Sequence, residues 1–271
     1  MDLKSIEQLE YKWLDKLHSL LYAQTDEIIK GFNSKKAILD DWAGKYGEHE
    51  NNKEAQNSMF DKGAERVVYT ILNMQLFSNV NSAPVGADLF YEMEDCFVHI
   101  DLKTVGASNR PEKKSNIGDF TDIFIGENQN SYKGEIAVYK GKENEFFRPY
   151  TPNLPTYYGK GSKNEKICLS FFVNVLHDKN TFDTLIISIL SFPNGELVKH
   201  YGDRPLKPGK NPAKGSKTAK ARARVSNVNK FELLNETPSR VKLIYFKDDM
   251  DEKYKNKLTL YNELYKTNKL N

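Results

Sequence analysis

Two acidic residues and one lysine in the segment 84–105 have the types and the spacing that phosphodiester hydrolysis requires. Asp88 follows the turn-forming residues 84–86, and Asp101-Leu102-Lys103 comes thirteen positions later inside an apolar, β-branched run. Because successive side chains of a strand face opposite sides, Asp101 and Lys103 share one face. Carboxylate oxygens hold a hard divalent cation, and an ammonium group beside them can position water near a phosphate. We therefore interpret Asp88, Asp101 and Lys103 as a candidate catalytic set that works with Mg²⁺.

Two features favour this interpretation over a hairpin that merely carries surface charges. Asp101 follows residues 97–100, Phe-Val-His-Ile, where strand propensity disfavours an acidic side chain, so its cost must be offset by a role. A turn at residues 94–95 would bring Asp88, at the start of one strand, back beside Asp101 in the next. Glu92 shares a strand face with Asp88 and is either an accessory ligand or a solvated side chain. We expect His99, on the Asp101 face, to be packed or to lie at the solvent edge.

A second informative segment, residues 204–230, carries nine Lys and Arg residues and no acidic residue, although the whole chain sums to only +3. Such a concentration of positive charge is typical of a loop that binds nucleic acid, because cations displace counterions from phosphates. A disordered solubilising loop is the alternative. Arg222 and Arg224 alternate on an expected strand and could reach guanine edges in the major groove. The residues expected to contact DNA are Lys207, Lys210, Lys214, Lys217, Lys220, Arg222 and Arg224.

Hydrophobic periodicity predicts helices and strands in an order typical of an α/β or α+β fold with a central mixed β-sheet flanked by helices. We expect helices over 3–22, after an N-cap at Ser34, over 58–76 and over 254–270. The expected strands are 89–93, 96–105, 120–125, 135–139, 167–176, 184–190 and 241–246, whereas 44–58 and 146–164 are expected to be loop or irregular. We interpret residues 1–271 as a single nuclease domain, with a helical part in 1–50 and a basic DNA-recognition segment in 199–230.

Composition narrows the class of protein. No apolar stretch approaches the ~20 residues that a membrane-spanning helix needs, and the chain has only two cysteines. We therefore expect a cytoplasmic protein without a disulfide framework or a membrane partner. Neither a phosphate-binding Gly-x-x-x-x-Gly-Lys-Ser/Thr loop nor a Gly-x-Ser-x-Gly nucleophile elbow is present.

The arrangement of Asp88 and Asp101-Leu102-Lys103 resembles the PD-(D/E)XK nuclease motif, with Ala87 in place of the proline. The order of further stretches resembles type II restriction endonucleases of this superfamily that cut interrupted palindromes. These stretches are 99–106, His-Ile-Asp-Leu-Lys-Thr-Val-Gly, then 191–195, Ser-Phe-Pro-Asn-Gly, and finally Pro208-Gly-Lys210 followed by Arg222-Ala-Arg224-Val.

The resemblance implies a Mg²⁺-dependent homodimer that makes sequence-specific cuts in both strands of DNA, with one active site per strand and a cognate DNA methyltransferase. It implies catalytic roles for Asp88, Asp101 and Lys103, and Glu65 as a further, helix-borne metal ligand. Lys210, Arg222 and Arg224 would contact bases, and Pro212 replaces an acidic residue, so the bases read are expected to differ. A repair or junction-resolving nuclease of the same superfamily and a non-catalytic nucleic-acid-binding protein remain as alternatives.

Overall fold

The computed structural model describes residues 1–34, 53–76, 79–80, 86–107, 123–140, 144–178, 181–208, 222–225, 240–256 and 258–270. Its helices are α1 (Leu3–Ala23), a helical stretch over 25–34, α3 (Lys53–Gln75), α4 (Val198–Tyr201), α5 (Glu252–Lys255) and α6 (Thr259–Leu270), with 3₁₀ turns η1 (Glu127–Gln129) and η2 (Gly195–Leu197). Its strands are β1 (Asn79–Val80), β2 (Leu89–Glu92), β3 (Cys96–Ala107), β4 (Ile123–Gly126), β5 (Gly134–Lys140), β6 (Asn144–Tyr150), β7 (Tyr157–Tyr158), β8 (Lys166–Asp178), β9 (Thr184–Phe192), β10 (Lys207–Pro208), β11 (Arg222–Val225) and β12 (Val241–Phe246).

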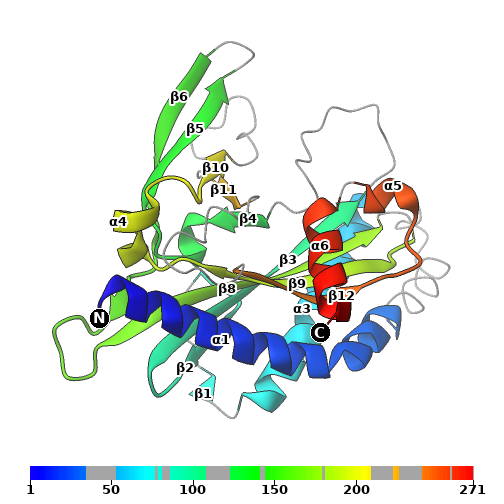
Figure 1. Ribbon diagram of the computed structural model, residues 1–271, viewed down its shortest axis with the longest axis horizontal. Helices are drawn as coiled ribbons and strands as arrows, with labels where there is room; N and C mark the ends of the chain where they lie inside the picture. Colours follow the sequence, from blue (N-terminus) through cyan, green and yellow to red (C-terminus); the bar gives the residue numbers. More distant parts are fainter. Residues whose placement is uncertain are drawn as a thin grey trace.

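A seven-stranded sheet forms the centre, with strand order β1-β2-β3-β8-β9-β12 and β7 paired to β8 (Figure 1). β3 and β8 are parallel, and the other pairs in this sheet are antiparallel, so the sheet is mixed as predicted. The long connection from β3 to β8 carries β4, η1 and the two-stranded ribbon β5–β6, which projects from the body at the top of Figure 1. A three-stranded sheet, β10-β11-β4, joins this connection to the basic segment.

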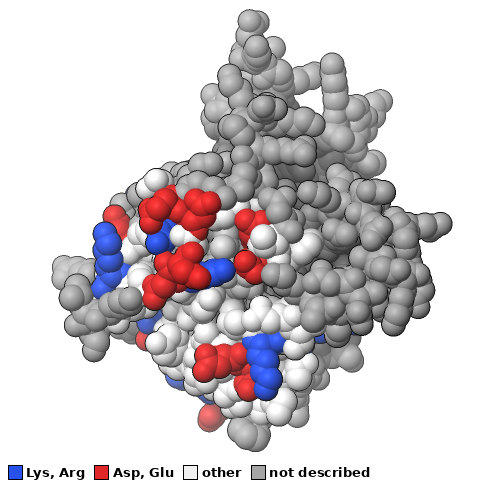
Figure 2. Space-filling view, turned by 90° about the vertical axis from the view of Figure 1, so that its right-hand side faces the viewer, with Lys and Arg blue, Asp and Glu red and all other residues white. Residues whose placement is uncertain are grey.

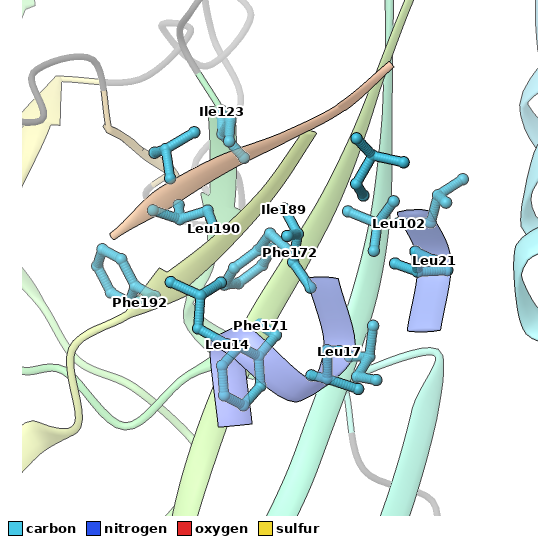
Figure 3. Close-up of a cluster of buried hydrophobic side chains, with 14 of the residues drawn as sticks. Leu14, Leu17, Leu21, Leu102, Ile123, Phe171, Phe172, Ile189, Leu190 and Phe192 are labelled. Atoms are coloured by element: carbon cyan, nitrogen blue, oxygen red, sulfur yellow. The ribbon is translucent and has the colours of Figure 1, made fainter. Parts of the chain in front are cut away.

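The long helix α1 covers one face of the central sheet because its apolar side chains recur every three or four residues. Asp2 caps the helix by accepting a hydrogen bond from the Ser5 N–H at 2.7 Å. The middle strands β8 and β9 are buried almost throughout, as expected for strands covered on both faces. Figure 3 shows a cluster of buried hydrophobic side chains from this core. It includes Leu14, Leu17, Leu21, Leu102, Ile123, Phe171, Phe172, Ile189, Leu190 and Phe192.

A fully buried ionic cluster fastens α1 to the start of β12. The Arg240 guanidinium lies 2.8 Å from Glu7 and 2.7 Å from Glu10, and all three side chains are inaccessible to solvent. Glu10 also accepts a hydrogen bond from the backbone N–H of Asn194 at 2.6 Å. Burial raises the pKa of Glu10, which the neighbouring Arg240 opposes. Removing one member would therefore leave an uncompensated buried charge.

Most predicted strands are confirmed, but four details of the sequence interpretation are wrong. Ser34 is not a helix cap: it belongs to the helical stretch 25–34 and donates its hydroxyl to the Lys30 carbonyl. α3 begins at Lys53, inside the expected loop 44–58, and the expected helix 254–270 is divided into α5 and α6. Part of the segment expected to be irregular forms β6. This strand tolerates Pro149 because, among the described residues, β6 is an edge strand of the two-stranded sheet that it forms with β5. The helix expected after Ser34 lies outside the described residues.

Candidate active site

The hairpin of β2 and β3 brings Asp88 beside Asp101. Leu89 pairs with Ile100 in the antiparallel register, so the residue just before β2 meets the residues just after Ile100 in β3. The Asp88 carboxylate accepts a hydrogen bond from the backbone N–H of Leu102 at 3.0 Å. Asp88 itself is exposed. The predicted return of the hairpin is therefore confirmed, and it leaves one carboxylate open to solvent next to a buried one.

Asp101 is the buried carboxylate, with a side chain only 3% exposed. One of its oxygens forms an ion pair with the Lys103 ammonium, and the other accepts a hydrogen bond from the Gln129 amide at 2.6 Å. Burial raises the pKa of Asp101 to about 7, an effect that Lys103 opposes and that the charges of Asp88 and Glu65 increase. The folded protein therefore holds a carboxylate that is poorly solvated and that a positive ligand would stabilise.

Lys103 lies on the same strand face as Asp101, as the period of two predicted. Its side chain is 21% exposed, and its Nζ atom lies 5.9 Å from the centre of the Phe172 ring on the neighbouring strand β8. The ammonium group is thus held near Asp101 yet retains access to solvent. From that position the Lys103 ammonium group could contact a phosphate oxygen.

Helix α3 adds two side chains to the same region. The Glu65 carboxylate raises the pKa of Asp101, and Tyr69 follows Glu65 by one helical turn. Burial raises the pKa of the Tyr69 hydroxyl, and the charges of Asp88, Glu65 and Asp101 raise it further. The structure therefore places Glu65 near the other acidic residues, as the resemblance implied. Sequence reasoning missed Tyr69, although its i+4 spacing from Glu65 was a usable signal.

Two other candidate residues lie outside this cluster. The Glu92 carboxylate pairs with Lys166 at 2.9 Å and is 46% exposed, so it is the solvated strand residue rather than an accessory ligand. His99 is buried, stacks on Phe90 with ring centres 4.4 Å apart and contacts the Tyr158 hydroxyl at 3.0 Å. Burial lowers the pKa of His99 to about 4, so the ring is neutral and packed.

The described part of the basic segment forms a small sheet near the acidic cluster. Strand β11, predicted from Arg222-Ala-Arg224-Val, is confirmed, and Arg222 pairs with Gly126 of β4. On its other side, Arg224 pairs with Lys207 of β10. The remaining residues expected to contact DNA, which are Lys210, Lys214, Lys217 and Lys220, lie outside the described residues.

Charge on one side of the molecule is mixed rather than uniformly basic. Figure 2 shows acidic and basic side chains next to one another on the described surface at the right of Figure 1. Several form ion pairs in this part of the chain, such as Lys247 with Asp183 at 3.4 Å and Lys255 with Glu252 at 3.1 Å.

The carboxylates of Glu65, Asp88 and Asp101 fit a hard cation in chemical type. Mg²⁺ is usually held by one or two carboxylates together with waters and substrate phosphates. Among the described residues, no three acidic, His or Cys side chains lie close enough to one another to hold a metal ion by themselves. One oxygen of Asp101 already contacts the Lys103 ammonium, and the other already contacts the Gln129 amide. A cation can bind Asp101 through a lone pair that these contacts leave free or in place of one of them, and water and DNA would supply its further ligands.

Comparison with known families identifies the class of protein. Residues 2–181 match the family "Type II restriction enzyme MwoI, N-terminal domain", and residues 184–246 match its central domain. The chain belongs to the MwoI family of type II restriction enzymes. It is thus a restriction endonuclease that binds and cleaves DNA, as the sequence motifs predicted.

Two solved structures share the fold of this restriction enzyme. One is the restriction endonuclease BglI bound to its DNA recognition sequence, with 17% identity over 88% of this chain and 89% of BglI, at a TM-score of 0.61. The other is the tetrameric restriction endonuclease SfiI bound to cognate DNA, with 15% identity over 92% of this chain and 88% of SfiI, at a TM-score of 0.61. No curated protein matches the sequence. The predicted restriction-endonuclease-like fold is confirmed.

The helices in the described part of this restriction enzyme are too short or too polar to cross a membrane.

Proposed function

We propose that this restriction enzyme makes Mg²⁺-dependent, sequence-specific cuts in both strands of DNA at an interrupted palindrome. It would act in the cytoplasm as a homodimer, with one active site for each strand, and a cognate DNA methyltransferase would protect the host sequence. The observation that most supports this proposal is the cluster around Asp101. In it, Lys103 from the same strand and Asp88 from the start of the hairpin lie next to a buried carboxylate.

Each residue of the cluster has a role that follows from its position. Asp88 and Asp101 would hold the cation, with Glu65 as a third carboxylate from α3. When bound there, Mg²⁺ would polarise the scissile phosphate and lower the pKa of a coordinated water. Lys103, which is half-buried beside Asp101, would orient the attacking water and stabilise the negative charge that develops on the phosphate.

The basic segment would supply recognition. Positive side chains of the segment 199–230 would fix the register of the enzyme on DNA phosphates, while Lys210, Arg222 and Arg224 would contact bases. The pairing of β11 with β4 supports this role, since it joins Arg222–Val225 to the connection that also carries Gln129. In a two-fold symmetric dimer, the distance between the two segments would set the length of the interruption in the palindrome. We propose that residues 1–271 act as one nuclease unit, with 1–50 as its N-terminal helical part.

A cleavage assay on plasmid DNA of known sequence tests the proposal. The purified protein is incubated with Mg²⁺ or Ca²⁺, the products are separated on a gel, and the cut ends are sequenced. We expect discrete fragments with Mg²⁺ only, all ending at one interrupted palindrome. Cutting restricted to branched DNA would instead indicate a repair or junction-resolving nuclease, and metal-independent binding without cutting would indicate a binding protein. Sedimentation equilibrium then measures whether the active species is a dimer.

A further inference from the structure

Gln129 makes two hydrogen bonds that fix its side-chain amide in one orientation. Its Nε2 atom donates to Asp101 at 2.6 Å, and its Oε1 atom accepts from the backbone N–H of Gly126 at 2.7 Å. A carboxylate can only accept here and a backbone N–H can only donate, so both contacts would be lost if the amide were reversed. Gln129 is therefore a specific bridge between Asp101 and the end of β4.

The turn that carries Gln129 also packs tightly against the bend before Asp88. A Cβ atom at Gly86 would lie 1.9 Å from the backbone oxygen of Asn128, so only glycine permits this approach. The 3₁₀ turn η1 thus touches the segments that carry both carboxylates, through a hydrogen bond to Asp101 and through backbone contact near Asp88. A shift of η1 would change the position of these two carboxylates together.

The same turn is connected to the recognition strand. Gly126, whose N–H binds Gln129, is the last residue of β4 and pairs with Arg222 of β11. A displacement of β11 when its arginines engage DNA would therefore reach Asp101 through β4, Gly126 and the amide of Gln129. The links from Arg222 to Gly126, from Gly126 to Gln129 and from Gln129 to Asp101 are all direct contacts.

We propose that Gln129 is a positioning residue for Asp101 and couples the basic segment to the active site, so that DNA of the correct sequence raises the affinity of the site for a divalent cation. This inference rests on the proposed function. In the free enzyme the Gln129 amide and Lys103 together occupy the Asp101 oxygens. Movement of β4 would withdraw the amide from one oxygen and free the lone pair that it occupies for the cation. Coupling of this kind is reciprocal, so the cation would tighten binding of the correct DNA by the same factor.

The test measures DNA affinity with and without Ca²⁺, which serves as a cation probe that does not rely on cleavage. Fluorescence anisotropy gives the dissociation constant for a duplex with the recognition sequence, found by the plasmid assay, and for a scrambled duplex. For the wild type we expect Ca²⁺ to tighten binding of the recognition duplex at least about tenfold, within the roughly 5–150-fold typical of coupling between two binding sites. The scrambled duplex should show no such gain.

Gln129→Met keeps the length of the side chain and removes both hydrogen bonds. We expect its DNA affinity without Ca²⁺ to stay within about twofold of the wild type, while the Ca²⁺-dependent gain falls by roughly tenfold because the coupling is lost. Asn128→Ala, at an exposed position of the same turn, is the matched control and should keep the gain. Gln129→Asn, whose shorter side chain cannot span both partners, should behave like Gln129→Met and replaces it if the methionine variant does not fold.

Three results would overturn the inference: an unchanged Ca²⁺-dependent gain in the Gln129 variants, an equal loss in Asn128→Ala, or no gain in a wild type that cleaves its site with Mg²⁺. A wild type that cleaves no DNA with Mg²⁺ would instead refute the proposed function. The two failures are therefore distinguishable.

Discussion

Replacing Asp101 by asparagine is expected to stabilise the folded protein at pH 8 while abolishing DNA cleavage. Burial raises the pKa of Asp101 from 3.8 to about 7, so the ionised carboxylate is less stable in the folded protein than in the unfolded chain. Each pH unit between these two values corresponds to about 1.4 kcal/mol, which gives a cost of about 4 kcal/mol for the ionised group. An asparagine amide would place a hydrogen-bond donor beside the Lys103 ammonium, and this unfavourable contact lowers the free energy of unfolding by roughly 1–2 kcal/mol. The expected net gain is therefore about 2–3 kcal/mol.

The sign of the pH dependence follows from proton linkage. Between pH 3.8 and about 7 the folded protein binds a proton at Asp101 that the unfolded chain has released, so the stability contributed by this group falls as pH rises through that interval. Asparagine does not titrate. The advantage of Asp101→Asn over the wild type should hence be full above about pH 8 and should shrink by about 3 kcal/mol on lowering the pH to 5.

Urea unfolding at pH 5 and pH 8, in the presence of EDTA, measures this difference for each variant. Asp88→Asn is the matched control, because Asp88 is exposed and asparagine can still accept the hydrogen bond from Leu102. We expect the control to lose cleavage with only a small pH-dependent gain in stability, because it removes the Asp88 charge but leaves the burial of Asp101, which is the largest cause of the raised pKa. A destabilised Asp101→Asn at pH 8, or a difference between wild type and variant that ignores pH, would refute the reasoning.

Three further substitutions test other parts of the structure. Lys103→Ala should abolish cutting and keep specific DNA binding in gel-shift assays with Ca²⁺, and persistent cutting would remove Lys103 from the mechanism. Arg240→Met leaves the buried carboxylates of Glu7 and Glu10 uncompensated, so urea unfolding should show a loss of about 3–5 kcal/mol; an unchanged midpoint would contradict this. Gly86→Ala places a methyl group 1.9 Å from a backbone oxygen of η1. We expect the free energy of unfolding to fall by about 1–3 kcal/mol and cleavage to be slower. Cleavage at the wild-type rate would show that η1 tolerates the shift.

The central sheet could be predicted from the sequence because its strands are continuous apolar runs. β12 has the predicted bounds, and β3 and β8 extend the predicted ranges by two or three residues. Period-two alternation then placed Asp101 and Lys103 on one face, and a two-residue turn implied the return of Asp88. All of these are local signals, and local signals are reliable for long, strongly patterned segments.

The missed features depend on contacts between distant segments. Gln129 lies in a short polar turn 28 positions after Asp101, and nothing in its neighbourhood indicates that β4 returns it to β3. Arg240 meets Glu7 across 233 positions, and a lone arginine before a strand has many possible roles. For Glu92 the sequence left two interpretations open, an accessory ligand or a solvated side chain. The ion pair with Lys166 of β8, which no local signal indicates, and the exposure of the carboxylate decide for the solvated side chain.

The two family matches divide the chain near residue 182, yet the structure joins the two parts in both of its main sheets. In the small sheet, β4 comes from the first match and pairs with β11 from the second. In the central sheet, β8 comes from the first match and pairs with β9 from the second. Separating the parts would leave one edge of β8 unpaired and would remove β11 from β4, the strand that leads into the turn with Gln129. The proposed catalytic strand β3 and the proposed recognition strand β11 lie in different sheets and are linked through β4 and η1, so the proposed coupling would let an interaction at β11 reach Asp101 without any movement between separate domains.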